Sequence, residues 1–349
     1  MSTVETNQKV NMPIDLQYKD GQFYIVILKT ARRYYFDPFF LDSLKALYNI
    51  SLKKETEEEN NKLVKSLDYS TSNHAIETWT IEKFTDEYST SVPQNKLLFV
   101  FHISRCGSTL ISQILSDSKK FFVISEPPII NKILDPKSGL SKQIFSKLLI
   151  ASMNCINSSA PEKSKDTVIK FRSWNTIYLK EITELFPTAP WIFVHRKGSE
   201  VLASTLQKPP GWLRSQKTYA EFYSKILTLE TPYIIECGRE EFVTRLLGYF
   251  CKLAYSNQSE KSYFLDYRNL IDNLFDTLKY AIDYEPNDKE KEKMNETIGI
   301  YSKDPNKKIK FTNDSELKNS SLSILQLNLT EQFTESERYK LLNRADYEN

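Results

Sequence analysis

Hydrophobic and polar residues alternate on both sides of Asp20-Gly21, in the stretch IDLQYKDGQFYIVILK (residues 14–29). A period of two is typical of strands, and Asp-Gly suits the positive φ angles of a tight hairpin turn. A β-hairpin is therefore predicted at the start of the chain. Apolar residues at helical spacing from Asp37 predict a helix in FDPFFLDSLKALYN. The charged run KKETEEENNK (residues 53–62) is interpreted as a solvated helix exterior or loop.

Alternation returns in HAIETWTIEKF (residues 74–84), which predicts one more strand before the loop SVPQN. From Lys96 the pattern changes to short apolar runs separated by segments of helical length, as in parallel strands joined by crossover helices. Strands are predicted at 96–103, 121–125, 167–171, 190–195 and 262–267. Helices are predicted at 108–118, 140–155, 174–186 and 198–207, with a helical pair across 217–258.

These elements predict an α/β protein with a P-loop-like three-layer fold around a central parallel sheet. Residues 1–92 would form an N-terminal accessory region of hairpin, helix and strand, and residues 93–349 the main domain with a polar C-terminal extension. The tail from Pro286 to Ser320 has few apolar residues and is expected to be irregular, with a short helix near ESERYKLLNR.

Composition narrows the classes of function. The 349 residues include 47 Lys and Arg against 45 Asp and Glu, a net charge of +2. This balance disfavours nucleic acid or an anionic membrane as the main partner, so any anion site must be local. The start of the sequence has no apolar targeting segment, and its longest apolar run is too short to span a bilayer. A cytoplasmic protein without a membrane span is expected.

Cysteine and histidine offer little material for a metal site. The four cysteines are scattered without a CxxC pair, and there are only three histidines. Neither a zinc site nor a disulfide framework fits, so we expect reduced thiols and no metal. Two histidines, His102 and His195, lie in or at the end of apolar strands and are interpreted as structural. Chemistry should then depend on carboxylate, Lys and Arg side chains.

The segment SRCGST, from Ser104 to Thr109, stands between a predicted strand and a predicted helix. The carboxyl end of a strand in an open α/β sheet is where ligands bind, and a helix N-terminus offers unpaired N–H groups to an anion. Gly107 would let the backbone approach a phosphate, while Ser108 and Thr109 would add hydroxyl donors. A simple helix N-cap is the alternative.

This loop does not fit the nucleoside-triphosphatase pattern GxxxxGK[ST], because Ser108 stands where that pattern needs Lys. A donor whose single 5′-phosphate is joined to sulfate would need neither that Lys nor magnesium. A phosphotransferase using ATP is thereby disfavoured.

SRCGST resembles the 5′-phosphosulfate loop of the sulfotransferase superfamily, Pro-(Lys/Arg)-Ser-Gly-(Thr/Ser)-Thr. Arg105 falls on the basic position and Gly107 on the glycine, whereas Ser104 replaces the common Pro and Cys106 the common Ser. The motif is most similar to tyrosylprotein-type and bacterial sulfotransferase-like proteins. The resemblance implies binding of the co-substrate 3′-phosphoadenylyl sulfate, with contacts from Arg105, Cys106, Gly107, Ser108 and Thr109.

A second segment, WIFVHRKGSEVLAST, is similar to the family's 3′-phosphate segment, a buried strand ending in Arg with a Ser on the following helix. Arg196 and Ser204 keep the family's separation of eight residues. An Arg at the strand tip and a hydroxyl about two helical turns along can meet one phosphate. A surface ion pair for Arg196 is the alternative.

Sulfuryl transfer to a hydroxyl needs a base for the acceptor proton and cations for the leaving phosphate. Glu126, which ends FFVIS, is predicted as the base from its place at the sheet edge and its family-like distance from Arg105. Lys170 resembles a family Lys facing the transferred group and would act beside Arg105. Arg172 points to the same side of the strand, so the sequence does not rank the two.

Two softer matches remain. DYRNL at Asp266 resembles the family's Tyr-Glu-Asp-Leu segment and bears on fold, and the loop KPPGWLRSQ would cover cofactor or acceptor or simply connect two helices.

The resemblance spans about residues 95 to 275. It implies a sulfotransferase acting on an acceptor hydroxyl. The alternative is a catalytically inactive nucleotide-binding or scaffold protein. The acceptor class, the role of residues 1–92 and the oligomeric state are left open.

Overall fold

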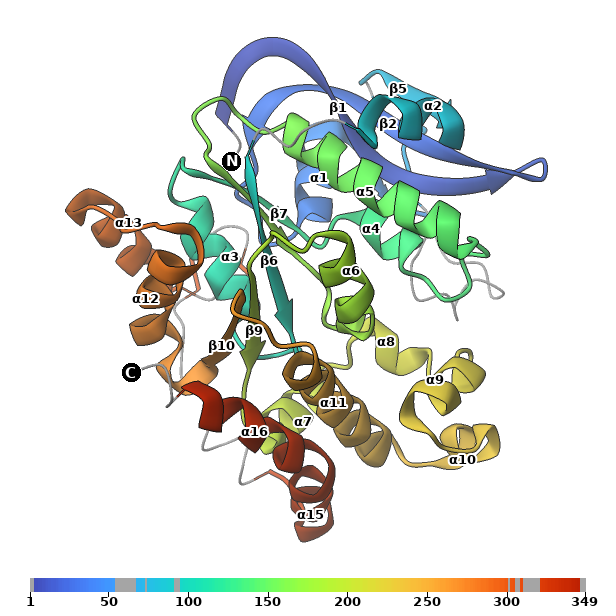
Figure 1. Cartoon of the computed structure of the whole chain (residues 1–349), viewed down its shortest axis with the longest axis vertical. Coiled ribbons are helices and arrows are strands. Elements are labelled where there is room, and N and C mark those ends of the chain that lie inside the picture. The colour runs from blue at the N-terminus through green and yellow to red at the C-terminus, as the bar shows by residue number, and fades with distance from the viewer. Residues whose placement is uncertain are drawn as a thin grey trace.

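The computed structural model describes residues 3–53, 67–72, 74–90, 95–300, 302–304, 308–309 and 321–345 (Figure 1). Most of the charged run at 53–62, the loop at 91–94 and most of the tail at 305–320 lie outside these residues.

The N-terminal hairpin is long and closes where it was predicted. Strands β1 (Thr3–Lys19) and β2 (Gln22–Tyr34) pair antiparallel, with Lys19 opposite Gln22. Asp20 and Gly21 have φ angles of 51° and 80°, which both central residues of a type I′ turn require. Strand β5 (Ile76–Thr80) pairs with β2, and helix α1 (Phe40–Tyr48) and the short pair β3 (Ser51–Leu52) and β4 (Leu67–Asp68) complete the region.

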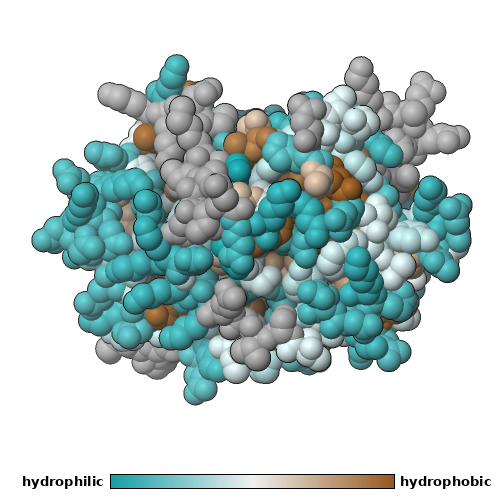
Figure 2. Space-filling view, turned by 90° about the horizontal axis from the view of Figure 1, so that it is seen from above, coloured by the Kyte–Doolittle hydropathy of each residue, from teal (hydrophilic) through white to brown (hydrophobic). Residues whose placement is uncertain are grey.

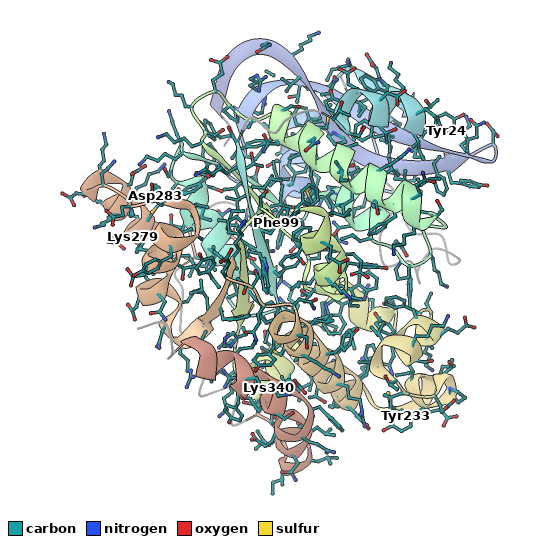
Figure 3. The ribbon with its side chains drawn as sticks, viewed as in Figure 1. Tyr24, Phe99, Tyr233, Lys279, Asp283 and Lys340 are labelled. Atoms are coloured by element: carbon teal, nitrogen blue, oxygen red, sulfur yellow. The ribbon has the colours of Figure 1, made fainter. Side chains whose placement is uncertain are left out.

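The centre of the molecule is a five-stranded parallel sheet in the order β10-β9-β6-β8-β7. All five predicted strands are confirmed, with β8 beginning one residue earlier: β6 (Lys96–His102), β7 (Phe121–Ser125), β8 (Asp166–Lys170), β9 (Trp191–His195) and β10 (Ser262–Asp266). Phe99, labelled in Figure 3, lies fully buried in this sheet. The chain runs from β6 to one edge, returns through β8 and continues to the other edge, so its direction reverses beside β6.

Helices cover both faces of the sheet, which confirms the three-layer α/β fold (Figure 1). On one face lie α3 (Ser108–Ser116), α12 (Leu270–Ile282) and α13 (Asp288–Ile298). On the other lie α5 (Lys142–Ser158), the 3-10 turn η2 (Ser173–Tyr178), α6 (Leu179–Leu185) and α11 (Arg239–Ser256). The remaining helices join these layers: α2 (Ile81–Tyr88), α4 (Pro128–Ile133), α7 (Gly198–Gln207), α8 (Gly211–Arg214), α9 (Ala220–Leu227), α10 (Thr231–Glu236), η3 (Tyr267–Asn269), α15 (Ile324–Thr330), the π-turn η4 (Glu331–Glu335) and α16 (Ser336–Ala345).

Three sequence predictions are wrong in part. The strand beginning near Ile76 ends at Thr80, whose hydroxyl accepts a hydrogen bond from the Lys83 N–H at 3.2 Å and starts α2. The tail is helical at 288–298, because Asn287 and Glu290 form a reciprocal capping box. The helical pair across 217–258 consists of three helices, and α12 was not predicted. The helix near ESERYKLLNR is confirmed as α16.

The N-terminal and C-terminal segments both pack on the central layers. Strand β1 packs on α4 and α5, and its buried side chains join the same hydrophobic cluster as the parallel sheet. The C-terminal turn η4 lies on α11, where Gly248 admits the carbonyl oxygen of Phe333. Glu335 accepts a hydrogen bond from the Gly198 N–H at 2.5 Å and so caps α7. Seen from above, the surface is mostly hydrophilic with small hydrophobic areas between (Figure 2).

Candidate functional site

A cavity of about 610 Å³ opens at the carboxyl ends of strands β6, β7, β8 and β9. Its volume is within the range of roughly 300–1,000 Å³ typical of ligand pockets. All the residues predicted for the site line it: Arg105, Cys106, Gly107, Ser108, Thr109, Glu126, Lys170, Arg196 and Ser204. The sheet thus brings together residues that are up to 100 positions apart in the sequence.

The segment 104–109 makes a sharp turn from β6 into α3. Ser104, Arg105 and Gly107 have positive φ angles of 81°, 50° and 86°. Proline is fixed near −65°, so it cannot occupy the position of Ser104 in this conformation. The Ser at position 104, where the sulfotransferase loop that SRCGST resembles has Pro, is compatible with this conformation.

Gly107 allows the loop to pack tightly against the segment DYRNL. A Cβ at Gly107 would lie 2.8 Å from Leu270 Cδ2 and 2.9 Å from Tyr267 Cδ2, closer than side-chain atoms approach one another. The glycine is required both for its φ angle and for this contact. The segment DYRNL, which the sequence analysis related to the fold and not to the site, thus packs directly against the loop.

The thiol of Cys106 is buried and hydrogen-bonded within the protein. Its Sγ donates to the Val194 carbonyl oxygen at 3.1 Å, and burial raises the pKa of the thiol to about 11. Ser108 and Thr109 form the first turn of α3 and line the cavity, so the positive end of this helix faces the cavity.

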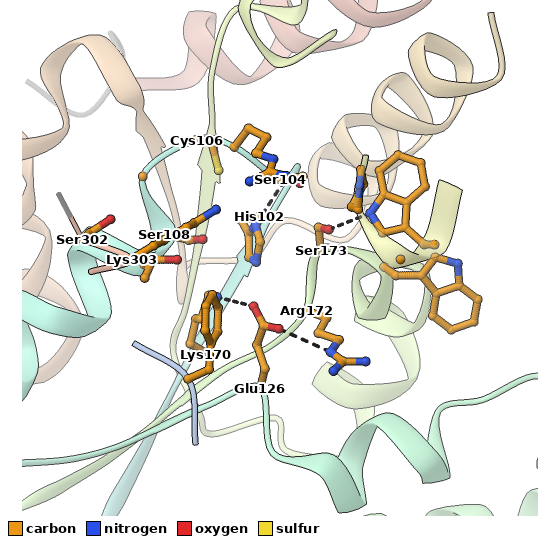
Figure 4. Close-up of a pocket in the computed structure, with 18 of the residues that line it drawn as sticks. His102, Ser104, Cys106, Ser108, Glu126, Lys170, Arg172, Ser173, Ser302 and Lys303 are labelled. Carbon is orange, nitrogen blue, oxygen red and sulfur yellow. Dashed lines mark hydrogen bonds and ion pairs between the residues drawn. The ribbon is translucent and has the colours of Figure 1, made fainter. Parts of the chain in front are cut away.

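Glu126 lies between two cations at the end of β7 (Figure 4). Its Oε1 is 2.5 Å from Lys170 Nζ, and its Oε2 is 3.3 Å from Arg172 Nε. Burial alone would raise the pKa of this carboxyl, but the charges of Lys170 and Arg172 outweigh it and lower the pKa to about 2. The side chain of Lys170 is 1% exposed and that of Arg172 is 35% exposed. Lys170 is thus the buried partner and Arg172 the solvent-facing one.

The sequence analysis interpreted both His102 and His195 as structural, and both side chains are buried. The Nε2 of His102 donates to the Phe171 carbonyl oxygen at 3.1 Å, and its Nδ1 accepts from the Ser104 N–H at 3.0 Å. Burial and the nearby Lys170 charge lower the pKa of His102 to about 3, so the ring is neutral and holds the loop. His195 is also buried, which lowers its pKa.

Arg196 reaches the cavity but is held by a carboxylate that the sequence analysis missed. Its Nε donates to Glu200 Oε2 at 2.5 Å, and its guanidinium lies 4.1 Å from the centre of the Tyr267 ring. Both Arg196 and Glu200 are buried. Arg196 precedes α7 and Glu200 lies in its first turn, and this separation of four residues was the available signal. Ser204 lies two turns along α7 and lines the same cavity.

Lys303 and Ser302 also line the cavity and were missed, because they belong to a polar tail without a recognisable pattern. Both lie near Ser108 (Figure 4). Burial and the charges of Arg105 and Lys170 lower the pKa of Lys303 to about 8. A group of cations thus surrounds the loop and favours an anionic ligand.

The loop KPPGWLRSQ covers one side of the cavity through Pro210, Gly211 and Trp212. The indole N–H of Trp212 donates to Ser173 Oγ at 3.2 Å, and Arg105 donates to the carbonyl oxygen of Lys208. Among the described residues, no cluster of His, Cys, Asp or Glu suits a metal ion. None of the helices described has the length and apolar character needed to cross a bilayer.

Comparisons with known proteins give fold similarity only. No protein-family model matches the chain, and no curated protein matches its sequence. Among solved structures, the chain is similar to a sulfotransferase from Mycobacterium avium, at 12% identity and a TM-score of 0.44, over 73% of this chain and 81% of that one. It is also similar to a sulfotransferase from Mycobacterium tuberculosis H37Rv, at 13% identity and a TM-score of 0.41, over 73% and 81% of the two chains.

A third similar structure is the sulfotransferase domain from the curacin biosynthetic pathway, at 15% identity and a TM-score of 0.38, over 69% of this chain and 98% of that domain. The solved structures that this chain is similar to thus include several sulfotransferases, and the similarity concerns the fold.

The Glu126–Lys170 pair should make stability depend on pH. The carboxyl pKa is about 2 in the folded protein against an ordinary value of 4.5, so ionised Glu126 stabilises the fold above about pH 4.5. That stabilisation is lost as the pH falls toward 2. Glu126→Gln should lower the free energy of unfolding at pH 7 by about 1–3 kcal/mol and by less at pH 3, where part of the stabilisation has been lost.

Urea unfolding at the two pH values measures this difference, with Glu221→Gln, an exposed residue of α9, as the control. An equal effect of Glu126→Gln at pH 7 and pH 3 would show that the ion pair does not stabilise the fold.

Proposed function

We propose that this protein transfers a sulfuryl group from 3′-phosphoadenylyl sulfate to an acceptor hydroxyl. The observation that supports this most is the meeting of three elements in one cavity: the loop 104–109, the Glu126–Lys170 pair, and Arg196 with Ser204. An anion-binding helix start, a carboxylate beside a cation and a second basic site are what a two-phosphate donor and a hydroxyl acceptor would need.

The loop would hold the 5′-phosphosulfate through the N–H groups at the start of α3 and the hydroxyls of Ser108 and Thr109. Arg105 and Lys303 would add positive charge on that side, and Arg196 with Ser204 would bind the 3′-phosphate. A cavity lined by two buried cations, Lys170 and Arg196, and by the partly exposed Arg105 and Lys303 is suited to a polyanion.

In the reaction, the acceptor oxygen would attack the sulfur while the bond from sulfur to the bridging phosphate oxygen breaks. The electron pair stays on the phosphate, where Lys170 and Arg105 would stabilise it, and Glu126 would take the acceptor proton. A carboxyl with a pKa of about 2 is a weak base. We infer that donor binding draws Lys170 toward the sulfuryl oxygens and so raises the basicity of Glu126.

The test combines binding with turnover. Adenosine 3′,5′-bisphosphate should bind, and labelled sulfate should pass from the donor to a hydroxyl acceptor. Glu126→Gln should reduce turnover by about 10²- to 10⁴-fold while bisphosphate affinity changes little. Arg105→Ala should likewise reduce turnover more than affinity.

Absence of bisphosphate binding would overturn the proposal. Binding that Glu126→Gln leaves unchanged, without transfer to any acceptor, would instead identify an inactive nucleotide-binding protein.

Lys303 provides a second test. Its pKa of about 8 in the free protein should rise when an anion binds, because a nearby negative charge favours the protonated amine. Bisphosphate binding at pH 8 should therefore take up a fraction of a proton. Calorimetry in two buffers of different ionisation enthalpy measures this uptake, which Lys303→Met should remove and Lys197→Met, an exposed control, should keep. Uptake unaffected by Lys303→Met would exclude Lys303 from the site.

Glu200 provides a third test, because it accepts a hydrogen bond from the guanidinium of Arg196, which would bind the 3′-phosphate. Glu200→Gln removes a negative charge from that place and should strengthen bisphosphate binding on the order of tenfold, about 1.4 kcal/mol. Adenosine 5′-monophosphate, which lacks the 3′-phosphate, is the control ligand and should bind unchanged. Equal effects on both ligands would place the 3′-phosphate elsewhere.

A further inference from the structure

The lining of the cavity is apolar where the N-terminal region contributes to it. Four apolar residues of that region line it: Phe39, Leu41, Leu52 and Leu67. They come from the start of α1 and from the strands β3 and β4. None of the four belongs to the segments proposed to bind the donor, so this wall needs another ligand to explain it.

The apolar wall extends to the Glu126–Lys170 pair. The ring centre of Phe39 lies 5.1 Å from Lys170 Nζ, and this nitrogen is 2.5 Å from Glu126. Burial and, after it, the charges of Asp37 and to a lesser extent Glu126 raise the pKa of Asp42 on α1. A molecule lying on this wall would therefore have one end beside the predicted base.

Two indoles, Trp174 and Trp212, also line the cavity. Their N–H groups are already used: Trp174 Nε1 donates to the Tyr223 hydroxyl at 2.8 Å, and Trp212 Nε1 donates to Ser173 Oγ at 3.2 Å. They consequently offer apolar ring surface rather than free donors. Asn131, nearby in the lining, uses its amide N–H groups on the carbonyl oxygens of Glu126 and Pro127.

We propose that the N-terminal region forms the acceptor site, and that the acceptor is an uncharged, largely apolar phenol or alcohol. Its ring or chain packs on Phe39, Leu41, Leu52 and Leu67, and its hydroxyl faces Glu126. A saccharide is disfavoured because each hydroxyl left unpaired against leucine costs about 1–3 kcal/mol. This inference rests on the proposed sulfuryl transfer and adds the acceptor class to it.

The experiment measures binding of 2-naphthol, through its fluorescence, to the full chain saturated with adenosine 3′,5′-bisphosphate. Leu41→Ala should weaken naphthol binding about five- to thirtyfold, as expected for loss of a buried leucine contact. Leu47→Ala is the matched control, since this leucine is also half-buried on α1 but does not line the cavity. Bisphosphate affinity should be the same in both variants.

Transfer assays then compare 2-naphthol with N-acetylglucosamine and a tyrosine-containing acidic peptide. Preferred transfer to 2-naphthol, with KM raised in Leu41→Ala only, supports the inference. Lack of naphthol binding, an equal effect of both substitutions, or preferred transfer to the sugar or peptide would overturn it while bisphosphate binding stands. Failure to bind the bisphosphate would instead overturn the proposed function itself.

Discussion

The turn at Gly107 is the constraint on which the site depends. A residue without a side chain lets the loop leave β6 with positive φ angles and lie directly on Tyr267 and Leu270. The same Tyr267 ring lies under the guanidinium of Arg196. One glycine contact therefore connects the end of β6, the start of α3, the tip of β9 and the segment after β10. A Cβ at position 107 would lie 2.8 Å from Leu270 Cδ2 and 2.9 Å from Tyr267 Cδ2, so any larger residue there would force these side chains to shift.

Ion pairs between buried and partly buried side chains are the second feature of the cavity. Four of its charged residues are paired with opposite charges: Lys170 and Arg172 with Glu126, and Arg196 with Glu200, which lies behind the lining. Buried charges are tolerated only when such partners compensate for lost hydration. An anionic donor would exchange these internal partners for its own oxygens, so binding would rearrange charge rather than add it to an apolar space. Burial and, beside it, the charges of Arg105 and Lys170 lower the pKa of Lys303 in the free protein.

The two terminal segments contribute to the cavity in different ways. The N-terminal region contributes an apolar wall, and the C-terminal turn holds α7 through the Glu335 carboxylate on the Gly198 N–H. The sheet edge supplies the proposed chemistry between them. This division would allow the acceptor to vary with the N-terminal region while the donor-binding edge stays the same.

Local patterns in the sequence were sufficient for the five parallel strands, the Asp20-Gly21 turn and the candidate loop, because apolar periodicity and turn chemistry act over a few residues. The residues at strand ends could also be assigned, since parallel strands present their carboxyl ends to one edge. Helix α13 and the end of β5 were misjudged, because capping side chains outweighed the apolar pattern there.

Only the tertiary structure determined which side chains contact one another in the cavity. It joined Lys303 and the leucines of the N-terminal region to the site, paired Arg196 with Glu200, and distinguished buried Lys170 from half-exposed Arg172. Such contacts join segments far apart in the chain, and their strength depends on burial, which periodicity along a sequence does not encode.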